Sequence, residues 1–109
     1  MISIIIPTFN EEKRIGATLE KIASFVRSFV EETEIIIVDD ASTDKTSKVA
    51  KSFRGKIKNL KVLRLEKSPY AGKGYAVNQG VLASSGNLIL FTDADGSTPI
   101  QEIDKLLSK

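Results

Sequence analysis

The sequence predicts an α/β fold in three layers, with a mainly parallel four-stranded sheet and helices on both of its faces. Four short apolar runs have the length and composition of buried strands; they are residues 2–6, 34–38, 60–65 and 87–92. The segments between them carry apolar residues at helical spacing. Strands and helices that alternate in this way form a parallel sheet covered on both sides. The 109 residues are enough for a single domain, residues 1–109.

The first run is expected to end at Pro7, where polar residues lead into a helix that ends near Val30. Thr8 and Glu11 have the spacing of a capping box, and Asn10 is an alternative N-cap. A helix that starts at the carboxyl end of a strand favours an anionic or polar ligand there. The alternative is that this segment only turns the chain.

The second run leads directly into Asp39 and Asp40. Ser42 or Thr43 is expected to cap the next helix, with Asp44 in its first turn. Capping does not explain Asp39 and Asp40, because both precede the cap. At the carboxyl end of a strand, their carboxylates can accept hydrogen bonds from a base N–H or from ribose hydroxyls.

Lys61 and Arg64 place the third run at an edge of the sheet, since charged side chains protect exposed edges. In the helix that follows, the small residues Ala76 and Gly80 lie four positions apart and would let the helix approach the sheet closely. Gly86 is expected to end this helix as a C-cap.

Lys73 lies between Gly72 and Gly74 at the start of the same helix, where its charge can meet a phosphate group. The spacing of these glycines fits neither a Walker A sequence nor a dinucleotide-binding fingerprint. A solvated lysine in a glycine-rich turn is the alternative.

The fourth run carries no charge over residues 88–91, which predicts a strand buried on both faces, and it is followed by Asp93 and Asp95. Two carboxylates this close repel each other, and a divalent cation relieves that repulsion. Mg²⁺ is typically held by carboxylates together with substrate phosphates. The pair therefore predicts a metal–diphosphate site, unless one aspartate caps a turn and the other is solvated. A last short helix is expected over residues 98–107.

Composition excludes several classes of function. The chain has neither histidine nor cysteine, which excludes a Ser-His-Asp triad, an ordinary zinc site and disulfide chemistry. Its lysines and arginines are interpreted as spread along the chain, which predicts no nucleic-acid partner. No apolar run approaches the roughly 20 residues that span a bilayer, and the N-terminus has no signal-peptide pattern. A cytoplasmic protein is expected, with a place at the membrane surface left open.

Four motifs occur in the order IIPTFNEE, IIIVDDASTDKT, GKGYAVNQG and FTDADGS. Together they resemble the nucleotide-sugar-binding half of family 2 glycosyltransferases with the GT-A fold. They are most similar to the polyprenyl-phosphate (dolichyl-phosphate) mannose and glucose transferases. The resemblance covers essentially the whole chain and implies a Rossmann-like sheet with the strand order 3-2-1-4.

The resemblance also implies roles for individual residues. The nucleoside pocket would be lined by Pro7, Thr8, Asn10 and Glu11. Asp39 would contact the ribose or the base and Asp40 the base, while Lys73 would approach the base and the diphosphate. Asp93 and Asp95 would form a DxD motif that binds Mg²⁺ or Mn²⁺, with Asp93 also at the nucleotide.

The implied reaction is transfer of a sugar, with inversion, from a UDP- or GDP-linked donor to an acceptor such as a polyprenyl phosphate. The family's catalytic domain is about twice as long as this chain, so the acceptor site and the catalytic base are expected beyond Lys109. Ser97 stands where mannosyl members often have a glutamine, which favours a glucosyl-type or other relative and leaves the sugar open. A homodimer that pairs through the apolar edge at residues 87–92 is also expected.

Two other interpretations stay open. The sequence LFTDADGST also resembles the first motif of haloacid-dehalogenase-type phosphatases, in which Asp93 would be the nucleophile and Asp95 the acid or base, with Mg²⁺. That interpretation leaves Asp39 and Asp40 without a role. The other is a non-catalytic nucleotide-binding domain.

Overall fold

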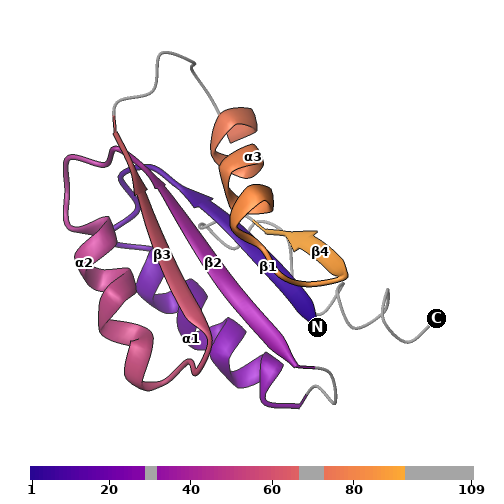
Figure 1. Ribbon diagram of the computed structural model, residues 1–109. Coiled ribbons are helices and arrows are strands. Elements are labelled where there is room, and N and C mark those ends of the chain that lie inside the picture. Colours follow the sequence, from indigo (N-terminus) through magenta and orange to yellow (C-terminus); the bar gives the residue numbers. More distant parts are fainter. Residues whose placement is uncertain (29–31, 67–72, 93–109) are drawn as a thin grey trace.

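The computed structural model describes residues 1–28, 32–66 and 73–92, and these form three layers around a parallel sheet (Figure 1). In chain order the elements are β1 (Ile2–Thr8), α1 (Ile15–Val26), β2 (Thr33–Asp40), α2 (Thr46–Lys51), the 3-10 turn η1 (Ser52–Gly55), β3 (Leu60–Leu65), α3 (Lys73–Ala83) and β4 (Leu88–Phe91). The strand order is β3-β2-β1-β4 and every neighbouring pair is parallel. The predicted fold class and strand order are therefore confirmed.

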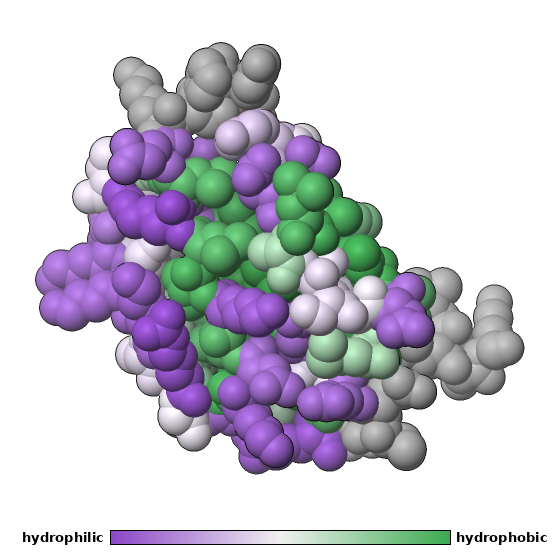
Figure 2. Space-filling model, in the orientation of Figure 1, coloured by the Kyte–Doolittle hydropathy of each residue, from purple (hydrophilic) through white to green (hydrophobic). Residues whose placement is uncertain are grey.

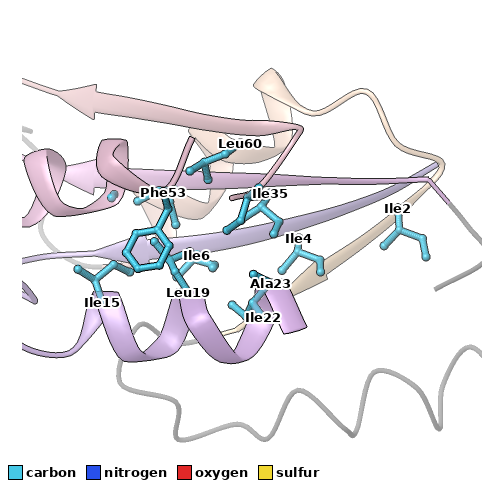
Figure 3. Close-up of a cluster of buried hydrophobic side chains, with 13 residues drawn as sticks. Ile2, Ile4, Ile6, Ile15, Leu19, Ile22, Ala23, Ile35, Phe53 and Leu60 are labelled. Atoms are coloured by element: carbon cyan, nitrogen blue, oxygen red, sulfur yellow. The ribbon is translucent and has the colours of Figure 1, made fainter. Parts of the chain in front are cut away.

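The two central strands, β1 and β2, bury side chains on both faces of the sheet. On one face, their alternate isoleucines pack with α1 and α2, and Ile15, Leu19 and Ile22 of α1 point toward the sheet (Figure 3). On the other face, Ile5 and Val38 pack against Ala76 of α3. Each isoleucine that is fully buried contributes about 1.5–3 kcal/mol to stability. The unbroken apolar runs follow from this double burial, because neither face of these strands meets water.

The approach of α3 to the sheet depends on its small residues, as predicted. A Cβ added at Gly80 would lie 2.6 Å from Ile5 Cγ2 and 3.1 Å from Val38 Cγ2. Ala76, one turn earlier, is buried against the same strands. α3 packs mainly on β1 and β2, and apolar surface remains visible on the face of the molecule that carries α3 (Figure 2). Leu63 of β3, which packs at the margin of this cluster, is only partly buried.

Gly86 does not act as the predicted C-cap, because α3 ends at Ala83 and Gly86 lies against β1. Its N–H donates to Ser3 Oγ at 2.9 Å. A Cβ at this position would lie 2.8 Å from the backbone atoms Met1 O and Ser3 N. Glycine is needed here for close approach to a neighbouring strand rather than for a left-handed helix end.

β1 continues one residue beyond Pro7, so the predicted strand end at Pro7 is wrong. On the β4 side of β1, the Ile5 carbonyl accepts a hydrogen bond from Thr92 N–H at 3.1 Å. The backbone nitrogen of Pro7, two residues further along β1, points to the same side as the Ile5 carbonyl. In a parallel ladder the next hydrogen bond would run from the N–H of residue 7 to the Thr92 carbonyl. Pro7 has no N–H, and β4 accordingly pairs with β1 only as far as Phe91, opposite Ile5.

The predicted ends of α1 and β2 also differ from the structure. α1 ends at Val26 rather than near Val30, and residues 29–31 lie outside the described part. β2 runs through Asp39 to Asp40, so both aspartates belong to the strand instead of following it. The strand extends because β3 pairs with it along this stretch, with Asp40 opposite Leu65.

The outer strands behave differently from each other. β3 is an edge strand, and its Lys61 and Arg64 confirm the predicted edge position. β4 is not buried on both faces as predicted: Leu88 is 42% exposed and Phe91 is 51% exposed. Within the described residues β4 has only β1 as a neighbour, which leaves part of its apolar surface accessible. The predicted helix over residues 98–107 lies outside the described residues.

Candidate functional site

The segments after β1 and β2 meet at the carboxyl end of the sheet (Figure 1), where ligands bind in open parallel sheets. Three successive N–H groups of the first segment donate to side chains of the second: Asn10 to Ser42 Oγ at 2.8 Å, Glu11 to Thr46 Oγ1 at 2.8 Å and Glu12 to Asp44 Oδ2 at 3.2 Å. In return, Thr43 N–H donates to Asn10 Oδ1 at 2.9 Å. We call residues 9–14 the first loop and residues 41–45 the second loop. The hydrogen bonds join them into one unit.

These contacts replace the predicted capping box of Thr8 and Glu11, which is not formed. Thr8 belongs to β1, and its hydroxyl donates to the Val38 carbonyl at 3.4 Å. α1 begins only at Ile15, and its N-cap residue Arg14 makes no side-chain capping bond. Asn10, the alternative cap, instead has a left-handed backbone with φ 51°. The N–H groups that a local cap would satisfy are instead satisfied by the second loop and by Thr46, the first residue of α2.

The predicted cap of the second helix is also wrong. α2 begins at Thr46, and Asp44, rather than Ser42 or Thr43, accepts hydrogen bonds from the Thr46 N–H at 3.0 Å and from its hydroxyl. Burial raises the pKa of Asp44, but the hydrogen bonds from Thr46 and from Glu12 N–H outweigh it and hold that pKa below its ordinary value. Ser42 and Thr43 are thereby free to bond the first loop.

Asp39 is completely buried, and its carboxylate is surrounded by groups of its own chain. It accepts hydrogen bonds from the Ser42 N–H at 3.1 Å, from the hydroxyls of Ser42 and Ser47, and from Arg64 Nη1 at 2.9 Å. Arg64 also donates from Nη2 to the Ser42 carbonyl at 2.8 Å. Sequence reasoning missed Arg64 and Ser47 as members of this region, because only the β2–β3 register brings Arg64 opposite Asp39.

Asp40 lies on the other face of the sheet. Successive side chains of a strand point to opposite faces, so Asp40 continues the series of Ile36 and Val38, which pack against α3. Its side chain is half-buried, and none of the described residues donates a hydrogen bond to it or forms an ion pair with it. A depression of about 350 Å³ near this end of β2 and β3 is lined by Ala41, Arg64, Leu65 and Glu66. Because Asp39 is fully buried and Asp40 is only half-buried and unbonded, Asp40 is the carboxylate of the two that a ligand can reach.

Glu11 carries a second available acceptor. Its Oε2 atom is buried and accepts no hydrogen bond, although Arg14 Nε lies 3.1 Å away as an ion-pair partner. A buried oxygen that accepts no hydrogen bond is uncommon in native proteins, and beside its ion pair with Arg14 this atom can still accept one. Asn10, beside it, is exposed, whereas Pro7 and Thr8 are buried inside β1.

The remaining predicted site residues are only partly located. Lys73 is the first residue of α3, but its side chain lies outside the described part, as do Asp93 and Asp95. The backbone of β4 leads to the same sheet edge, because the Thr92 N–H, just before Asp93, donates to the Ile5 carbonyl of β1. Among the described residues, no group of three acidic side chains could hold a metal ion.

Positive charge gathers on the α2 side of the second loop. Half of the lysines and arginines lie between residues 45 and 64, where there is no acidic residue. A depression of about 650 Å³ is lined by the second loop together with Lys45, Lys48, Lys51 and Arg64. The interpretation of evenly spread cations is therefore wrong at this side of the molecule. In the parts that the structure describes, no helix is long and apolar enough to cross a membrane.

A sequence model of glycosyl transferase family 2 matches residues 3–109. The dolichyl-phosphate beta-glucosyltransferase of Homo sapiens is 36% identical over 110 residues, covering 96% of this chain and 34% of that protein. S. aureus TarS in complex with UDP-GlcNAc superposes with a TM-score of 0.80 at 32% identity, over 98% of this chain and 31% of that chain. The mannosyltransferase PcManGT from Pyrobaculum calidifontis, in complex with GDP-Man and Mn²⁺, gives a TM-score of 0.74 at 27% identity, over 93% and 29%.

This chain thus spans about a third of the length of the proteins that it matches. The match runs through both joined loops, and the fold of the neighbours is the one described above. The chain belongs to glycosyl transferase family 2.

Proposed function

We propose that this chain binds the nucleoside diphosphate of a UDP- or GDP-linked sugar at the joined loops and is the donor-binding part of a glycosyltransferase. The observation that carries the proposal is the pair of available acceptors, Asp40 and Glu11 Oε2, at the carboxyl end of the sheet. Solved relatives bind UDP-GlcNAc and GDP-Man. Membership of the family does not favour the phosphatase interpretation.

In this proposal different side chains bind the base, the ribose and the diphosphate of the nucleotide. Asp40 accepts a hydrogen bond from a base N–H, since none of the described residues donates to it. Glu11 Oε2, which is ion-paired with Arg14 but accepts no hydrogen bond, accepts one from a ribose hydroxyl. Asn10, exposed beside Glu11, borders the bound nucleoside. Lys73, at the start of α3, meets the diphosphate. The lysines beside the second loop raise the local positive potential and draw the anionic donor toward the site.

Asp93 and Asp95 are the residues that would hold a divalent cation, Mg²⁺ or Mn²⁺. The donor set fits such an ion, because two carboxylates one residue apart, completed by phosphate oxygens, are the ligands that hard cations prefer. The segment directly before them reaches the sheet edge at Thr92. A bound cation would neutralise charge on the departing nucleoside diphosphate.

The acceptor in this proposal is a polyprenyl phosphate, as the name of the dolichyl-phosphate beta-glucosyltransferases indicates for those relatives. An acceptor oxygen attacks the anomeric carbon, the bond to the diphosphate breaks, and the configuration inverts. The residues of this chain contribute binding and orientation of the donor. Holding the donor in place lowers the entropic part of the barrier.

Isothermal titration with UDP and GDP, with and without Mn²⁺, tests the proposal. We expect one nucleotide to bind, more tightly with Mn²⁺, and Asp40→Asn to weaken it by about tenfold or more, the usual effect of losing a hydrogen bond to a charged group. Asp95→Ala should remove the effect of Mn²⁺ and leave the fold intact. Glu20→Gln is the matched control, because Glu20 is an exposed acid on α1 that pairs with Lys56. Equal binding by wild type and Asp40→Asn would contradict the proposed role of Asp40.

A further inference from the structure

We infer that the two adjacent aspartates have separate roles: Asp39, held by Arg64, is a positioning residue that fixes the shape of both loops, and Asp40 alone meets the nucleotide. The inference rests on the proposed function and extends it to a residue pair that no ligand touches. It replaces the sequence-based expectation that Asp39 contacts the ribose or the base.

The carboxylate of Asp39 has no capacity left for a ligand. An ionised carboxylate offers about four acceptor positions, and Asp39 already receives the Ser42 N–H, two serine hydroxyls and the Arg64 guanidinium. Its side chain is also completely shielded from solvent. A ligand atom could bond Asp39 only after one of these groups had left.

Arg64 connects three parts of the chain through one planar group. Nη1 donates to Asp39 Oδ2 at 2.9 Å and Nη2 donates to the Ser42 carbonyl at 2.8 Å. The guanidinium therefore links β3 to the end of β2 and to the second loop. Lysine could keep the charge next to Asp39 but could not hold both acceptors in a fixed fork.

The effect of this pair reaches the first loop through Ser42. The Ser42 hydroxyl donates to Asp39 Oδ1 and accepts the Asn10 N–H at 2.8 Å. Asn10 in turn accepts from Thr43 N–H at 2.9 Å. Between Asp40 and Ser42, Ala41 has a left-handed backbone with φ 58°, a conformation that persists only where the surroundings impose it. The network around Asp39 supplies that constraint, and it ends next to Glu11 and Asp40.

The chain contains a matched control for this pair at the other end of the same strands. Lys61 of β3 lies 2.9 Å from Glu34 Oε1 of β2, whose side chain is 3% exposed. This is again a half-exposed cation on β3 paired with a buried acid on β2. Glu34 bonds Ser3 and Ser85, far from the two loops in the strand register.

The experiment compares Arg64→Met, Arg64→Lys, Asp39→Asn and Lys61→Met. For each variant, UDP and GDP affinity is measured by titration, the free energy of unfolding by urea, and loop order by hydrogen exchange of the N–H groups of residues 10–12 and 42–43. We expect Arg64→Met and Asp39→Asn to lose about tenfold or more in affinity and to exchange faster at these amides. Arg64→Lys should recover part of the affinity. Lys61→Met should lower stability while keeping affinity and loop exchange at wild-type values.

Two results would overturn the inference: wild-type affinity in Arg64→Met, or affinity that falls in Lys61→Met as much as in Arg64→Met at equal loss of stability. The second result would mean that the Asp39 pair supports the fold in general and not the loops. If wild type binds neither nucleotide, the proposed function fails by itself. Loop exchange in Arg64→Met then still decides whether the pair holds the loops, and unchanged exchange would refute it.

Discussion

At Gly80, a single added methyl group should push α3 away from the sheet and lower the stability of the fold. In Gly80→Ala the new Cβ would lie 2.6 Å from Ile5 Cγ2, 3.1 Å from Val38 Cγ2 and 3.3 Å from Ile5 Cδ1. Both partners are completely buried and have no room to turn away. Overpacking of this kind costs about 1–3 kcal/mol. Alanine regains about 1 kcal/mol of helix propensity over glycine, so we expect a net loss of about 1 kcal/mol.

Gly74 on the same helix provides the control, because a Cβ added there meets nothing within 4 Å. Gly74→Ala should stabilise the chain by up to about 1 kcal/mol through helix propensity alone. The difference between the two variants then isolates the steric cost, about 1–3 kcal/mol. Urea unfolding followed by circular dichroism measures both free energies. If Gly80→Ala is stabilised as much as Gly74→Ala, α3 does not pack as closely on β1 and β2 as the structure shows.

Three further predictions concern the charge of Glu34, the backbone conformation of Ala41 and the exposed edge strand β4. Burial raises the pKa of Glu34, but hydrogen bonds from Ser3, Ser85 and Lys61 outweigh burial and lower that pKa. The ionised Glu34 therefore contributes fully to the free energy of unfolding above the ordinary glutamate pKa of about 4.3, and this contribution is lost as the pH falls through the lowered pKa. Glu34→Gln should be less stable at pH 7 and lose less stability between neutral and acid pH in urea titrations; a pH dependence identical to wild type would contradict this. Ala41→Gly should gain up to about 1 kcal/mol, because relief of the left-handed strain exceeds the added unfolded-state entropy, and a lower melting temperature would disprove it. Leu88→Lys, at an exposed position of β4, should reduce self-association of this chain in light scattering; a wild type that stays monomeric at high concentration would exclude the homodimer.

The topology could be predicted because it depends on patterns that a single sequence displays. Runs such as residues 34–38 are too apolar to face water on either side, which requires a central position in a parallel sheet. Lys61 and Arg64 interrupt the third run and mark an edge strand, as the structure confirms. The strand order itself came from the family resemblance. β4 was misjudged because an apolar run of four residues looks the same at an edge as in a core.

The caps could not be predicted because their partners are remote in sequence. Thr8 with Glu11 has the local spacing of a capping box, yet the N–H of Glu11 bonds Thr46, 35 residues away. Nothing in the sequence distinguishes a hydroxyl that caps its own helix from one that bonds a neighbouring loop. Only the parallel register, which sets Thr8 opposite Asp39, brings these loops into contact. The site residues were recognised by type, whereas their hydrogen-bond partners required the fold.

The separation of Asp39 from Asp40 follows from one shift in a strand boundary. A strand that ends at residue 38 leaves both aspartates in a loop, where either could turn toward a ligand. Once β2 includes them, their side chains must point to opposite faces. Asp39 then faces α2 and the charged edge strand, and the fold has to neutralise it with Arg64 and satisfy it with serines. Asp40 faces α3, where the described residues offer no such partner, and so it remains available to a ligand. Alternation along a strand thus assigns two chemically identical neighbours to two different tasks.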